Sequence, residues 1–195
     1  MKIRAIILSA LILCGISAVI MYSRAAQPQQ TSSVITQAIN DKNTPMVIKN
    51  LILKMKEQME VNDDQFPELI KEVENYTNSC ADSASVAVLH SMLAEMYQSY
   101  YQRNQWTINQ RTQLSGYIPE DIRVWTSNLF TDKIKEEIDL SLRPTPLLQN
   151  TPVSKFKDIL EIGKDSQTLR PTLYEFLAFR ALDIQPTVQI YKDLI

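Results

Sequence analysis

The chain has 195 residues, a formal net charge of −2 and only three glycines. So few glycines argue against a β-sandwich and against a fold with a phosphate-binding loop, because both need positive φ angles at their turns. The long amphipathic runs that fill most of the sequence predict an all-α fold instead.

Residues 1–25 have the pattern of a secretory signal peptide. Lys2 and Arg4 precede an uncharged stretch, and Ser23 and Ala25 place small residues at positions −3 and −1 of a cleavage site after Ala25. We therefore expect an exported protein of the periplasm or cell envelope, which contacts a membrane only through this segment.

Two alternatives to cleavage remain open. The uncharged stretch Ala5–Tyr22 is just short of a comfortable membrane span, so it could stay as an uncleaved anchor. Lipidation at Cys14 is the other option, although a bulky leucine precedes that cysteine. In each case the polar residues 26–32 are expected to be a flexible leader before a helical domain at residues 33–195.

Cleavage after Ala25 changes the charge and the cysteine content. It removes three basic residues and no acid, which leaves 17 basic against 22 acidic residues and a formal net charge of −5. A mildly acidic domain lacks the clustered basic face that nucleic-acid binding needs, so no nucleic-acid partner is expected. Cys80 is then the only cysteine, and we interpret it as a partly buried small residue and not as a reactive thiol.

Three helices are predicted before residue 80. The first ends near Lys42, the second begins at Thr44-Pro45 with Thr44 as its cap, and the third begins near Asp64. The third has five apolar residues on its inner face, namely Phe66, Leu69, Ile70, Val73 and Tyr76.

The stretch from Asp82 to Arg111 predicts one long core helix. Asp82 or Ser83 can cap its beginning. Val88 and Met92 widen the apolar surface beyond one stripe, as expected of a helix packed between two others. The main stripe follows 3-4-3-4 spacing and comprises Val86, Leu89, Leu93, Met96 and Tyr100.

The second half contains three further helical segments. A turn at Gly116 leads to a helix whose apolar side runs from Ile122 to Leu142. This helix could be broken near Thr131-Asp132. It ends at Arg143-Pro144-Thr145-Pro146. A short helix follows between Pro152 and Gly163, and Pro171–Ile184 is the last strong one before an apolar segment at Val188–Ile195. The helices pair into hairpins similar to a tetratricopeptide-type solenoid, although the full repeat signature is absent.

Three stretches carry a family resemblance: VAVLHSMLAEMYQSYYQRNQWTINQRT, then Trp125–Phe130 with KIKEEIDLSL, then LRPTLYEFLAFRALDI. Together they resemble the N-terminal helical region of large bacterial alpha-2-macroglobulin-like proteins, strongly from about Val86 to Ile184 and weakly from Ser33 to Ser83. The resemblance implies an export signal before this region and a series of β-sandwich domains after it. Those domains carry a protease-sensitive bait segment and, in many members, a thioester between a Cys and a nearby Gln. Members trap proteases when the bait is cut.

The parts of that family that trap proteases do not occur in this sequence. Neither Cys14 nor Cys80 is followed by the Glu-Gln that a thioester needs, and there is no bait-like segment or β-sandwich pattern. No functional residue of the family is therefore carried over. We expect the chain to be a fragment of a much larger protein, continued after Ile195 by more helices and then by β-domains.

Residues suited to acid–base chemistry do not suggest a catalytic site. His90 is the only histidine, and only Glu95 lies near it within two helical turns, so we interpret it as a packed, hydrogen-bonded residue. The acidic pairs Glu120-Asp121 and Glu136-Glu137 are interpreted as solvated helix faces. We expect no enzyme, no cofactor and no metal site.

Tyr97, Tyr101 and Trp106 form the one candidate partner-binding surface. As an exposed row they would line a groove for a peptide or glycan. Buried against the helix after Pro119 or Pro171, they would close a packing interface instead.

Two functions are therefore open. The first is a non-catalytic module of an envelope alpha-2-macroglobulin-like protease inhibitor, which docks to a protein partner or to the remaining domains of a larger polypeptide. The second is a stand-alone periplasmic helical-repeat module that binds a peptide or glycan.

Overall fold

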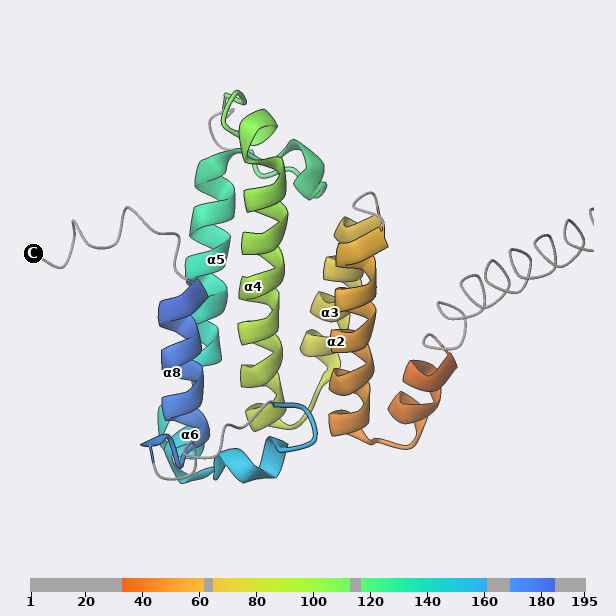
Figure 1. The fold of residues 1–195 in the computed structure, drawn as a ribbon, viewed down its shortest axis with the longest axis vertical. Coiled ribbons are helices and arrows are strands. Elements are labelled where there is room, and N and C mark those ends of the chain that lie inside the picture. Colours follow the sequence, from red (N-terminus) through yellow and green to blue (C-terminus); the bar gives the residue numbers. More distant parts are fainter. Residues whose placement is uncertain (1–32, 62–64, 113–116, 161–168, 185–195) are drawn as a thin grey trace, which may run out of the picture. The chain divides into compact units, whose positions relative to one another are not determined.

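The computed structural model describes residues 33–61, 65–112, 117–160 and 169–184. Every regular element in these residues is a helix, so the predicted all-α class is confirmed (Figure 1). Extended pairing among them is limited to one isolated bridge between Pro152 and Thr172. The predicted signal peptide, Cys14, the leader, both glycine turns and the segment after Pro186 lie outside the described residues.

The chain divides into two compact units, residues 1–54 and 55–195, and each is described by itself. The described part of the first unit contains a helix at 33–40 and the beginning of α2 (Thr44–Val61). The Asn43 Oδ1 atom accepts a hydrogen bond from the Met46 backbone N–H at 3.2 Å. The cap of α2 is therefore Asn43, and the prediction of Thr44 was wrong by one residue because the asparagine side chain reaches the free N–H groups first.

The second unit is arranged around α4 (Ser83–Ile108). Figure 1 shows α4 between α3 (Phe66–Ser79) and α5 (Ser127–Ser141), and α8 (Leu173–Ile184) also packs on it. Apolar side chains of α4 are buried on several sides, so the prediction of a core helix is confirmed. The fully buried ones include Ala87, Leu89, Leu93, Ala94 and Met96.

The N-terminal ends of α4 and α8 are capped by side chains that lie next to them in the sequence. Asp82 accepts hydrogen bonds from the Ser85 N–H at 3.3 Å and the Ser85 hydroxyl at 2.6 Å, as the predicted cap of α4 requires. At the start of α8, the Glu175 N–H donates to the Thr172 hydroxyl, and the Thr172 N–H donates to the Glu175 carboxylate. This reciprocal pair is a capping box.

The region between α4 and α8 differs from the prediction in three places. The predicted helix from Ile122 breaks at Trp125-Thr126, after the 3₁₀ turn η2 (Ile122–Val124), and α5 continues through Thr131 without interruption. The break falls there because the Trp125 Nε1–H donates to the Pro119 carbonyl at 2.7 Å and holds the backbone extended.

The other two differences follow proline positions. Pro144 has an extended backbone and directly precedes the short helix α6 (Thr145–Asn150), which was not predicted. Pro152 opens the 3₁₀ turn η3 (Val153–Phe156), where a longer helix was expected.

The solenoid-like array stays a prediction. In a solenoid each repeat contacts only its neighbours. Here α8 contacts both α6 and α4, so the last described helix returns to a helix much earlier in the chain. The described contacts of the second unit establish packing around α4 and do not establish a repeating order.

Asp82→Ala should lower the free energy of unfolding by about 1 kcal/mol at pH 7, because the cap of the central helix is lost. Partial burial raises the pKa of Asp82, but the Ser85 hydroxyl and the Lys155 ammonium outweigh it and lower that pKa. The contribution is therefore present at neutral pH and is lost as the pH falls through the lowered pKa. Urea denaturation followed by circular dichroism measures it. Asp139→Ala, at an exposed site in α5, is the control, and an equal loss there would contradict the capping role.

Candidate functional site

Tyr97 belongs to the core and not to an exposed surface. Its side chain is 1% exposed and stacks on Trp125, with ring centroids 5.7 Å apart and planes 7° apart. Its hydroxyl donates to Glu74 Oε1 on α3 at 2.6 Å. Burial and this bond to a carboxylate raise the pKa of Tyr97 far above its ordinary value, so the phenol stays neutral.

Tyr101 and Trp106 have different surroundings. Tyr101 is half-buried, its ring stacks on Phe130 at 5.8 Å, and its hydroxyl donates to Asn109 at 3.1 Å. Trp106 is 80% exposed. The three residues therefore do not form the exposed row that a groove would need. The reason is geometric: nine residues separate Tyr97 from Trp106, and at 3.6 residues per turn this places them about 180° apart around α4.

The polar contact between α4 and α5 is centred on Glu137. The His90 Nδ1 atom lies 2.7 Å from Glu137 Oε2, and Lys133 Nζ lies 2.9 Å from Glu137 Oε1. The prediction of a packed, hydrogen-bonded histidine is confirmed, but its partner lies 47 residues away on another helix. Glu95, the expected neighbour, pairs with Arg180 of α8 instead.

The interpretation of Glu136-Glu137 as a solvated face was wrong for Glu137. This residue is 2% exposed, because it lies on the inward face of α5 with Ile134 and Ser141 at helical spacing. Glu136 does face solvent and pairs with Lys133 at 2.9 Å. Neighbouring acids on one helix thus point in different directions.

Glu137 is ionised at neutral pH in the folded protein. Burial raises the pKa of Glu137, but the hydrogen bonds from His90 and Lys133 outweigh burial and lower the pKa below its usual value. A carboxylate in this position can orient the imidazole of His90. The nearest serine in sequence, Ser91, is buried and accepts a hydrogen bond from Arg180 Nε at 3.1 Å. The arrangement therefore connects α4, α5 and α8.

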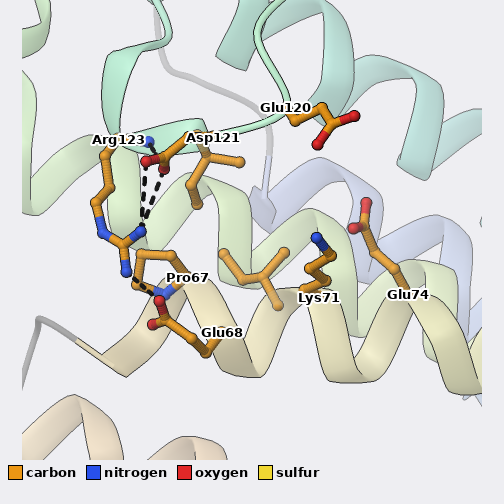
Figure 2. A pocket seen from close by; sticks show the side chains of 9 residues that line it. Pro67, Glu68, Lys71, Glu74, Glu120, Asp121 and Arg123 are labelled. Carbon is orange, nitrogen blue, oxygen red and sulfur yellow. Dashed lines mark hydrogen bonds and ion pairs between the residues drawn. The ribbon is translucent and has the colours of Figure 1, made fainter.

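A pocket of about 660 Å³ lies between α3 and the segment 120–123 (Figure 2). Two buried isoleucines, Ile70 and Ile122, are among its lining residues. The charged lining residues are Glu68, Lys71, Glu74, Glu120, Asp121 and Arg123. The sequence indicated only the acidic pair 120–121. The spacing of Glu68, Lys71 and Glu74 at intervals of three could have placed these charges near one another on α3, but not opposite residues 120–123.

Three other features were possible in the described part of the chain: a metal site, a reactive cysteine and a membrane-spanning helix. None of its His, Cys, Asp and Glu residues gather in a group of three or more that could hold a metal ion. Cys80 is half-exposed, as expected for a partly buried small residue. Among the described helices, none is long and apolar enough to cross a membrane.

Comparison with known proteins adds no relative: no family model, no curated protein and no solved structure matches the chain.

Glu137→Gln should lower the free energy of unfolding by about 2 kcal/mol at pH 7, because a buried carboxylate with two charge-assisted hydrogen bonds is lost. Because the pKa of Glu137 is lowered in the folded protein, its contribution to the free energy of unfolding is complete above the ordinary pKa of 4.5. This contribution is lost as the pH falls through the folded-state pKa. Urea denaturation at pH 7 and pH 3 should therefore show a smaller difference between wild type and variant at pH 3.

Glu136→Gln is the matched control, since Glu136 is the exposed neighbour on the same helix. It should change the free energy of unfolding by less than about 0.5 kcal/mol. If both variants lost the same stability at pH 7, Glu137 would not have the role assigned to it.

Proposed function

We propose that this chain is a non-catalytic interaction module that acts in docking or assembly. The observation that carries the proposal is Trp106, which is 80% exposed on the helix that is otherwise the most deeply packed of the second unit. Exposing an aromatic side chain to water costs free energy that burial against a partner recovers. Tryptophan is also enriched among the residues that contribute most to protein interfaces.

The surroundings of Trp106 suit an interface. It lies in the last turns of α4, whose other face is held by the ring contacts among Tyr97, Tyr101 and Phe130. A rigid support reduces the ordering cost of binding. Gln102 and Gln105 nearby on α4 are exposed, and such polar residues form the rim of many interfaces.

The groups suited to acid–base chemistry favour the same proposal. The contact of His90 with Glu137 holds α4 to α5, Lys133 pairs with Glu137 within α5, and Ser91 accepts a hydrogen bond from Arg180. Each has a structural role that explains its position. The stand-alone groove module needs Tyr97, Tyr101 and Trp106 on one exposed face, and the burial of Tyr97 in the core argues against it.

We further propose that this module belongs to an exported, envelope-associated alpha-2-macroglobulin-like protein. The support is the sequence resemblance from about Val86 to Ile184 and the signal-like pattern of residues 1–25. Within such a protein the helical domain would dock the polypeptide to a partner or to its other domains, and protease trapping would belong to those other domains.

The docking role is tested with a photo-crosslinking amino acid at position 106 of the full chain in its native cells. We expect one discrete adduct at position 106 and none at exposed Lys135 of α5. Trp106→Ala should weaken binding to the identified partner by at least about 2 kcal/mol. It should change the free energy of unfolding by less than about 0.5 kcal/mol, since Trp106 is mostly exposed. Equal labelling at both positions would contradict the proposal.

The family assignment is tested separately by immunoblotting envelope and cytosolic fractions of native cells with an antibody to the helical domain. We expect a single species far larger than the 22.4 kDa of this chain, recovered with the periplasm or envelope. A species of 22.4 kDa or less, or a cytosolic location, would contradict the assignment. The docking role does not depend on this result.

A further inference from the structure

At one end of the pocket between α3 and residues 120–123, a guanidinium is already bound by two carboxylates. There the Arg123 guanidinium lies between a carboxylate of each wall (Figure 2): it bonds Glu68 of α3, and it lies 3.4 Å from both Asp121 oxygens. These contacts lower the pKa of Glu68 and raise the pKa of Arg123. The chain thus shows, with its own arginine, how the two walls bind a guanidinium.

The other end of the pocket also has one carboxylate on each wall, but no guanidinium of the described residues lies between them. Figure 2 shows Glu74 of α3 and Glu120 of the opposite wall at this end, with the Lys71 amine beside Glu74. Among the described residues, Glu120 and Lys71 make no ion pair. Tyr97 in the core donates to one oxygen of Glu74, which holds this carboxylate in place.

The charge and shape of the pocket favour a cation with an apolar stem. Its lining has four carboxylates and two basic groups, an excess of two negative charges. A guanidinium is planar with five N–H donors and can bond carboxylates on two sides at once. Ile70 and Ile122 in the lining suit the methylene groups of the same side chain.

We propose that this pocket binds an arginine side chain of a protein partner, with the guanidinium between Glu120 and Glu74 and the stem against Ile70 and Ile122. Lys71 opposes this binding and limits its affinity. Trp106 is not among the lining residues, so the site is separate from the docking surface proposed above.

The test uses the purified full chain and a fluorescently labelled tripeptide, glycine-arginine-glycine with blocked ends, in a polarisation titration at low salt. The control peptide has citrulline, which keeps the shape of arginine without its charge. We expect the arginine peptide to bind at least fivefold more tightly than the citrulline peptide. Added salt should weaken the binding, because the charges are near the surface.

Two variants at exposed positions should act in opposite directions. Glu120→Gln should weaken binding of the arginine peptide about two- to fivefold, and Lys71→Gln should strengthen it by a similar factor, as for single partly exposed charges. Glu136→Gln on α5 should have no effect. Trp106→Ala should also leave binding unchanged, so a failure of the Trp106 docking role is distinguishable from a failure here.

Three results would overturn the proposal. One is equal binding of the arginine and citrulline peptides. Another is an unchanged affinity in both Glu120→Gln and Lys71→Gln, with each variant shown to be folded by circular dichroism. The third is equal binding of a lysine tripeptide, which would mean that the pocket attracts any cation and does not recognise a guanidinium.

Discussion

The contact between α4 and α5 is the constraint on which the rest of the second unit depends. It has an aromatic part, where Tyr97 stacks on Trp125 and both rings pack against Phe130, and a polar part, where Glu137 lies between His90 and Lys133. Aromatic stacking excludes water, and without water the buried carboxylate requires both of its cationic or N–H partners. Because Glu137 would be costly to bury in any other arrangement, this contact also determines how the two helices are aligned along their length.

The contact between α4 and α5 also explains the positions of the residues that are suited to acid–base chemistry. An imidazole beside a carboxylate can be part of a catalytic site, but here the His90–Glu137 contact joins α4 to α5, and the carboxylate also pairs with Lys133 of its own helix. On another side of α4, Arg180 contacts Ser91 and Glu95 and so fastens α8. The helix α4 therefore provides contacts for α3, α5 and α8, and one of its few large apolar residues left in water is Trp106.

The two proposed binding features have different physical characters. Trp106 offers apolar area on a rigid helix, which favours affinity through burial. The pocket at residues 120–123 offers fixed charges beside an apolar lining, which favours selection of a particular side chain. Tyr97 connects the pocket to the core, because its hydroxyl holds Glu74 while its ring stacks on Trp125. One residue of the pocket wall is thus bonded directly to the core.

Local patterns in the sequence determined much of the fold and little of the site. The periodicity of Leu89, Leu93 and Met96, the Asp82 cap and the helix before Ile184 depend on residues within a turn or two, and each was predictable. The separation of Trp106 from Tyr97 was also predictable, since helical geometry alone places residues nine apart on opposite faces. By contrast, only the tertiary structure decided that Glu137 is buried against His90 and that residues 120–123 face Lys71 and Glu74. These pairs lie 46 or more residues apart, and nothing in the sequence near one member indicates where the chain will bring the other.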